Sequence, residues 1–265
     1  MNSHRPRVSR TRIALAATIL ALALAASAFA ELAQKGNLFV RFDGGISPRA
    51  LPRSSPAPIG VRIEGTIRSL GGQHPPALRA IKVAVSREGH LDAAGLPVCR
   101  PTRIAQATSS QALAACGPAL VGGGGYTAKT SLADQQNVVF SGEILLFNSV
   151  LEGRPAILSH VYQANPAPVT RVFTFRIRRT AGTFGTVIAA RVPASLNRNG
   201  YLKSIYLQIQ RRYVSAGRSK SYLSAACPAP AGFSAAVFPF AKVSMSFADG
   251  RTLASTMTRS CKVRR

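Results

Sequence analysis

Apolar and polar residues alternate with a period of two along much of this chain, and the pattern is clearest in VTRVFTFRIR, residues 169–178. There Phe173, Phe175 and Ile177 alternate with threonine and arginine, as in a strand with one buried and one solvated face. The next segment, residues 183–193, has similar character, so we expect the two segments to pair as an antiparallel hairpin. The pattern predicts a mainly antiparallel β protein.

Further strand patterns are separated by turns rich in Gly, Pro and Asp. We expect strands at residues 37–42, 61–68, 81–86, 119–130, 138–148, 156–163, 201–213, 219–226, 235–247 and 251–261. One stretch differs, because Thr108 and Gln111 in TSSQALAAC form a capping-box pattern that predicts a short helix ending at Gly117. About a dozen strands with one small helix predict an all-β fold, an antiparallel two-sheet sandwich.

Residues 1–30 have the composition of an export signal. Four arginines precede the apolar run IALAATILALALAASAFA, which ends in an A-x-A pattern, Ala28 to Ala30, just before Glu31. An uncleaved anchor is the alternative, since about eighteen apolar residues are just long enough to span a bilayer. We expect export, with residues 31–57 as an N-terminal strand and Pro/Gly/Ser-rich connection and residues 58–265 as the sandwich domain.

The four cysteines predict two disulfides, since their number is even and the chain has an export pattern. Three pairings are possible, and we favour Cys99 with Cys116 and Cys227 with Cys261, because each pair brackets one structural unit. A zinc site is the alternative, but there is no C-x-x-C pair and no histidine near any cysteine. We therefore expect no metal site, and no sequence pattern predicts a cofactor.

The formal net charge is +25, and removal of residues 1–30, with four arginines and none of the nine acids, lowers it to +21. A field of this strength favours anionic partners such as nucleic acid, anionic lipid or acidic wall polymers. The competing interpretation is that an arginine-rich composition produces a solvated basic surface without a selected ligand.

Basic residues cluster near the ends of two predicted strands. The candidates for anion binding are Arg171, Arg176, Arg178, Arg179, Arg211 and Arg212, and they would form a cationic face if the two strands lay in one sheet. Exposed aromatic residues for base stacking are few, and no helix suited to a DNA groove is evident. We therefore expect a non-catalytic module that contacts anionic envelope polymers or lipid headgroups, without sequence-specific recognition of nucleic acid.

An extracellular hydrolase is the alternative from another functional class. His160 lies on a predicted strand and could belong to a Ser-His-Asp triad, although the chain has no G-x-S-x-G motif. Glu143, inside the apolar run SGEILLF, would need a partner such as arginine if it were buried. Residues 123–130, GGGYTAKT, differ from a phosphate-binding loop at Ala128, so we interpret them as a Gly-rich bend before a strand. We assign no catalytic residue.

Several segments resemble a family of secreted bacterial proteins to which no activity has been assigned. They are GLPVC (95–99), ALAACGPALVG (112–122), GRPAILSHVY (153–162), GTFGTV (182–187), SYLSAACPAPAGF (221–233) and FPFAKVSMSFADGRTLASTMTRSCKVR (238–264). The resemblance covers nearly all of the chain after Gly36. It implies export and a single shared fold, and it implies no functional residue.

Overall fold

The structure is a computed structural model that describes residues 31–131, 137–165, 167–193 and 200–264. The predicted export signal, residues 1–30, lies outside the described residues. Within the described ranges, no helix has the length and hydropathy needed to cross a membrane.

The chain forms one large sheet, two small β units and a short helix. The strands of the main sheet are β1 (Glu31–Lys35), β2 (Leu38–Ser47), β3 (Ala50–Leu51), β5 (Gly60–Ser69), β6 (Leu78–Ser86), β8 (Leu120–Ser131), β9 (Asn137–Leu151), β10 (Arg154–Gln163), β11 (Val169–Arg179), β12 (Phe184–Arg191), β13 (Gly200–Ile209), β17 (Ala235–Phe247) and β18 (Thr252–Val263). The remaining elements are β4 (Ala57–Pro58), β7 (Gly89–Leu91), β14 (Arg212–Ser215), β15 (Arg218–Ser221), β16 (Leu223–Ala225), α2 (Ser109–Cys116) and 3-10 turns at Leu70–Gly72, Pro101–Arg103 and Gly117–Ala119.

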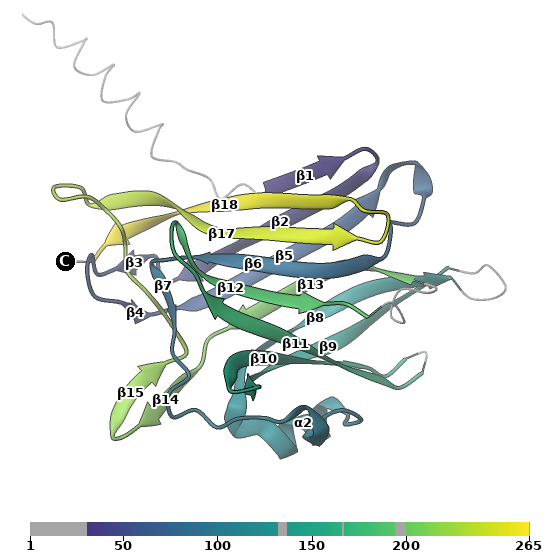
Figure 1. Cartoon of the computed structure of the whole chain (residues 1–265), viewed down its shortest axis with the longest axis horizontal. Coiled ribbons are helices and arrows are strands. Elements are labelled where there is room, and N and C mark those ends of the chain that lie inside the picture. Colours follow the sequence, from purple (N-terminus) through teal and green to yellow (C-terminus); the bar gives the residue numbers. More distant parts are fainter. Residues whose placement is uncertain (1–30, 132–136, 166, 194–199, 265) are drawn as a thin grey trace, which may run out of the picture.

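The thirteen strands of the main sheet follow the order β1-β2-β5-β13-β8-β9-β10-β11-β12-β6-β17-β18-β3. This single sheet curls into a half-barrel, with β1, β2 and β5 behind β18, β17 and β6 in Figure 1. The prediction of a mainly β protein with one short helix is confirmed, but the two-sheet sandwich is wrong. Alternation identifies the buried face of each strand, and a curled sheet has the same alternation as a sandwich.

The predicted hairpin is present as β11 and β12, which pair antiparallel with Ile177 opposite Ile188. Ile177 is buried on the concave face, whereas Arg176 and Arg178 are exposed on the convex face. The nearly continuous apolar run in β9 is also explained, because Ile144 belongs to a concave-face cluster and Phe147 to a cluster beneath α2. Residues 144–149 of β9 are therefore covered on both faces, whereas Val139 and Glu143, earlier in the strand, are exposed.

The helix α2 begins at the capping box that the sequence predicts. The Thr108 backbone N–H donates to Gln111 Oε1 at 2.9 Å, and the Gln111 backbone N–H donates to Thr108 Oγ1 at 3.3 Å. The end of the helix differs from expectation, because Gly117 has φ −50° and leads into a 3-10 turn. Gly117 therefore does not use the left-handed conformation common at helix ends.

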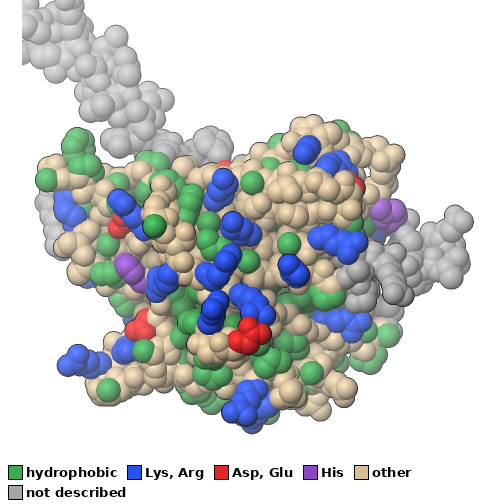
Figure 2. Space-filling view, viewed as in Figure 1, with side chains coloured by type: hydrophobic (Ala, Val, Ile, Leu, Met, Phe, Trp, Pro, Cys, Tyr) green, Lys and Arg blue, Asp and Glu red, His purple; other side chains and the backbone are tan. Residues whose placement is uncertain are grey.

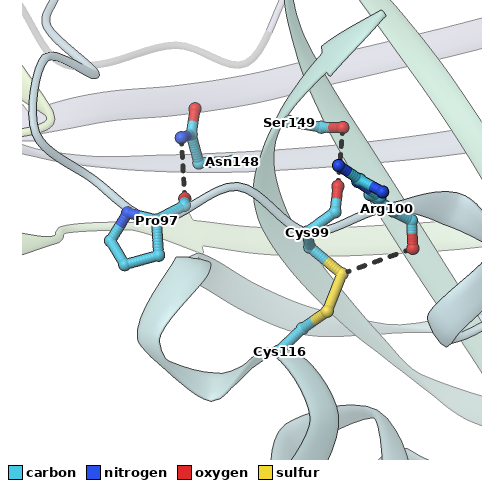
Figure 3. The surroundings of a disulfide bond; sticks show 6 residues. All are labelled: Pro97, Cys99, Arg100, Cys116, Asn148 and Ser149. Carbon is cyan, nitrogen blue, oxygen red and sulfur yellow. Dashed lines mark hydrogen bonds between the residues drawn. A yellow bond between two sulfur atoms is a disulfide. The ribbon is translucent and has the colours of Figure 1, made fainter.

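Both disulfides join the predicted cysteines, Cys99 with Cys116 and Cys227 with Cys261. Figure 3 shows the first bond, which ties α2 to the segment before it. The same segment is held to β9, since Asn148 Nδ2 donates to the Pro97 carbonyl at 2.9 Å and Ser149 Oγ donates to the Cys99 carbonyl at 2.8 Å (Figure 3). Two disulfides suggest an oxidising location outside the cytoplasm.

The concave face of the main sheet carries two apolar clusters. One includes Phe42 and Phe240, and the other includes Leu146 and Ile157. Residues of both clusters line an apolar cavity of about 180 Å³.

Candidate anion-binding surface

The predicted anion-binding arginines lie in two separate places. Arg171, Arg176, Arg178 and Arg179 belong to β11, whereas Arg211 and Arg212 lie where β13 leads into β14. The strands β8, β9 and β10 lie between β13 and β11 in the sheet. Arg212 belongs to the separate two-stranded sheet of β14 and β15, and Arg211 lies just before it, so the two groups do not form one continuous face.

Some of these arginines already serve the fold. Arg179 donates to Thr186 Oγ1 at 3.0 Å and to the Leu91 carbonyl at 3.2 Å. Arg171 donates to the carbonyl of its neighbour Thr170 at 3.0 Å. These contacts leave Arg176 and Arg178 as the members of the β11 group that point outward on the convex face.

Three further cations, which sequence reasoning missed, join Arg176 and Arg178 on that face. Lys82 of β6, Arg191 of β12 and Lys242 of β17 are all exposed. Their strands are consecutive neighbours of β11 in the sheet, in the order β11-β12-β6-β17. We call the set Lys82, Arg176, Arg178, Arg191 and Lys242 the basic face.

The register of the four strands places these cations in rows. Arg178 lies opposite Val187, which lies opposite Ala84, and Ala84 lies opposite Lys242. A second row has the same form, since Arg176 lies opposite Ala189, which lies opposite Lys82. Directly paired residues point to the same face of a sheet, so each row carries cations separated by small apolar residues.

The residues between the cations have short side chains, so no bulky group separates the charged side chains from one another. Figure 2 shows basic side chains gathered over the face formed by β17, β6, β12 and β11. Three strand spacings separate β11 from β17, which is about 14 Å across the sheet. The basic face is therefore extended in two directions, along the strands and across them.

One acidic residue, Glu152, contacts the basic face. Arg176 Nη1 lies 3.0 Å from Glu152 Oε2, and both side chains are exposed. The hydrogen bond and the positive charge of Arg176 lower the pKa of Glu152 below its usual value. Lys82, Arg178, Arg191 and Lys242 form no ion pair within the described ranges.

His160, the residue on which the hydrolase alternative depends, is completely buried. Its Nε2 lies 2.8 Å from the Ala107 carbonyl, which also accepts a hydrogen bond from Thr170 Oγ1 at 2.8 Å. A carbonyl can only accept, so His160 Nε2 carries the proton in this contact. The side chain fastens the segment before α2 to β10, which is a structural role.

The two other sequence features with possible chemistry are also part of the sheet. Residues 123–130 lie within β8 and pair with β13 and β9, so they are extended and form neither a bend nor a loop around phosphate. Glu143 is exposed on β9, opposite Gly125 and Tyr162, and forms no ion pair with another described residue. Because its side chain points to the convex face and is exposed, Glu143 does not need the ionic partner that a buried carboxylate would require.

The described ranges contain no cluster of three or more side chains suited to a metal ion. No protein-family model, no curated protein and no solved structure matches this chain.

Proposed function

We propose that this protein is an exported, non-catalytic module that contacts anionic lipid headgroups through the basic face. The observation that carries the proposal is the alignment of Lys82, Arg176, Arg178, Arg191 and Lys242 on four adjacent strands. The two disulfides support folding in an oxidising compartment, where such a module would meet the cell envelope.

The shape of the basic face favours a lipid surface over a single polymer strand. A linear polyanion is best followed by a narrow stripe or groove of cations. The basic face instead spreads over about 14 Å of sheet width, which suits a planar array of phosphate groups. Each lysine or arginine near an anionic membrane strengthens binding by about fivefold, so a few aligned cations are sufficient for measurable association.

Vesicle binding tests the proposal directly. The purified protein is mixed with phosphatidylcholine vesicles that contain about 30% phosphatidylglycerol, an anionic lipid that gives the vesicles a negative surface potential. The bound fraction is measured by flotation. We expect binding that falls steeply between about 0.05 and 0.5 M salt, because salt screens exposed charges. Pure phosphatidylcholine vesicles should not bind the protein.

Two results would contradict the proposal. Equal binding to neutral and anionic vesicles would show that headgroup charge plays no part. Absence of vesicle binding together with salt-sensitive binding to a soluble polyanion, such as a wall polymer, would assign the basic face to a polymer. The hydrolase alternative gains no support from the described residues, since His160 is buried and hydrogen-bonded to the Ala107 carbonyl.

A further inference from the structure

The concave face of the main sheet encloses a space that its own side chains do not fill. The cavity of about 180 Å³ is lined by inward residues of β6, β12 and β13, among other strands. Several of these aliphatic residues are only half-buried, and they include Ile81, Val83, Val85, Ile188, Ile205 and Leu207. Side chains in a filled interior are close-packed on all sides, so half burial at inward positions marks space left open.

The chemistry of the walls determines what this space can hold. Val83, Ile188 and Val243 form one continuous row across β12, β6 and β17, and all three line the cavity. A water molecule in a cavity needs about two to four polar partners. An apolar cavity of about 150 Å³ stays dry, yet it binds benzene or xenon. The row offers hydrocarbon alone, so the space suits an apolar group.

The small sheet of β4, β16 and β7 turns an apolar face toward the cavity. Leu223 and Leu91 are direct cross-strand partners there, and both line the cavity and pack against the cluster that includes Leu146. His90 and Ser224 alternate with these leucines, so their side chains point to the outer face of the small sheet. The small sheet lies at one end of the curled main sheet (Figure 1).

Apolar walls on the main sheet and on the small sheet match an apolar ligand. We propose that the cavity binds a single hydrocarbon chain, such as that of a long-chain alcohol. This site lies on the opposite face of the sheet from the basic face. The inference does not rest on the proposed contact with anionic lipid.

Displacement of a fluorescent probe tests the inference with neutral ligands. N-phenyl-1-naphthylamine is bound to the purified protein and displaced by 1-alkanols from hexanol to dodecanol, in the absence of vesicles. Affinity should rise about fourfold for each added methylene until the chain fills the cavity, and then level off. An uncharged headgroup keeps the result independent of the basic face. Failure of saturable probe binding, or displacement that does not depend on chain length, would overturn the inference.

A matched pair of variants locates the binding. Val83→Phe places a ring in the cavity, whereas Val187→Phe places the same ring on the convex face of the neighbouring strand β12. We expect Val83→Phe to weaken alkanol binding at least tenfold and Val187→Phe to leave it unchanged. Equal affinities in the two variants would place the ligand elsewhere and overturn the inference.

A measurement on the unmodified protein covers the case in which Val83→Phe does not fold. Crystals soaked with 11-bromoundecanol should show the bromine inside the cavity. Bromine density only on the outer surface would contradict the proposed site.

Discussion

Arg259 Nη2 lies 3.0 Å from Asp43 Oδ1, and this contact joins β18 to β2, two strands from opposite ends of the sheet order. Arg259 also donates to Glu31 Oε1 of β1 at 2.9 Å and to the Gly44 carbonyl. The Arg259 side chain is only 4% exposed, whereas Asp43 is 36% exposed. A buried cation between two acids therefore holds the ends of the curled sheet together.

This asymmetry in burial predicts unequal effects of removing each partner. The double variant Glu31→Gln and Asp43→Asn leaves a buried charge without an ionic partner, so it should lower the free energy of unfolding by about 3 kcal/mol. Arg259→Met leaves two partly exposed acids that water can solvate, so its cost should be smaller. Urea unfolding measures both, and a larger loss in Arg259→Met would contradict the role of the buried charge.

Tyr222 is fully buried, and its hydroxyl has no hydrogen-bond partner among the described residues. Burial, and to a lesser extent Tyr213, raises the pKa of Tyr222 well above its usual value near 10. In the unfolded chain the phenol loses its proton near pH 10, while in the folded state it keeps it. The stabilisation that comes from this raised pKa is present below pH 10 and is lost as the pH rises above that value.

Tyr222→Phe should therefore be neutral or stabilising by about 1 kcal/mol at pH 8, because it removes an unsatisfied buried hydroxyl. Its loss of stability between about pH 9.5 and 11 should be shallower than that of the unmodified protein. Tyr213→Phe is the control, since the Tyr213 hydroxyl lies 3.2 Å from the Asp92 carbonyl. Denaturant unfolding across this pH range measures both variants, and a destabilised Tyr222→Phe at pH 8 would refute the assignment.

The disulfide Cys99–Cys116 closes a short loop around α2, with a sequence separation of 17. Replacement of both cysteines by alanine should lower the free energy of unfolding by about 3 kcal/mol in the chain-entropy model. Hydrogen exchange should accelerate in residues 99–119, the segment that the bond closes into a loop, and remain slow in β11 and β12. Uniform acceleration across the whole protein would show that the bond stabilises the entire fold and not this segment.

The sequence predicts which face of each strand is buried, but it does not predict which strands are neighbours. Phe175 and Ile177 point to the concave face, and Arg176 and Arg178 to the convex face, as the alternation indicates. Strand β13 pairs with both β5 and β8, and these partners are distant in the chain from β13 and from each other. No local sequence pattern identifies such partners. The sequence therefore cannot distinguish a two-sheet sandwich from the single curled sheet that the structure shows.

The same limit applies to the basic face. Lys82 alternates with Ile81 and Val83, so its outward direction can be read from the sequence. The pairing of β12 with both β11 and β6 places Lys82 in the same row as Arg176, with Ala189 between them, and this arrangement depends on tertiary structure. Sequence reasoning therefore found the members on β11, missed those on the neighbouring strands, and grouped β11 with the distant Arg211.

The central claim is that position on the basic face, and not total charge, produces binding to anionic lipid. The direct test compares two variants that each lose two arginines. Arg178→Gln with Arg191→Gln removes two cations of the basic face, whereas Arg41→Gln with Arg68→Gln removes two exposed cations from β2 and β5.

The measurement is flotation with phosphatidylglycerol-containing vesicles at physiological salt, with circular dichroism to verify that both variants are folded. The basic-face variant should bind about 25-fold more weakly than the unmodified protein, at about fivefold for each cation. The control should lose less than about threefold, because charges far from the contact are screened. Equal losses in the two variants would show that net charge alone drives binding and would contradict the account.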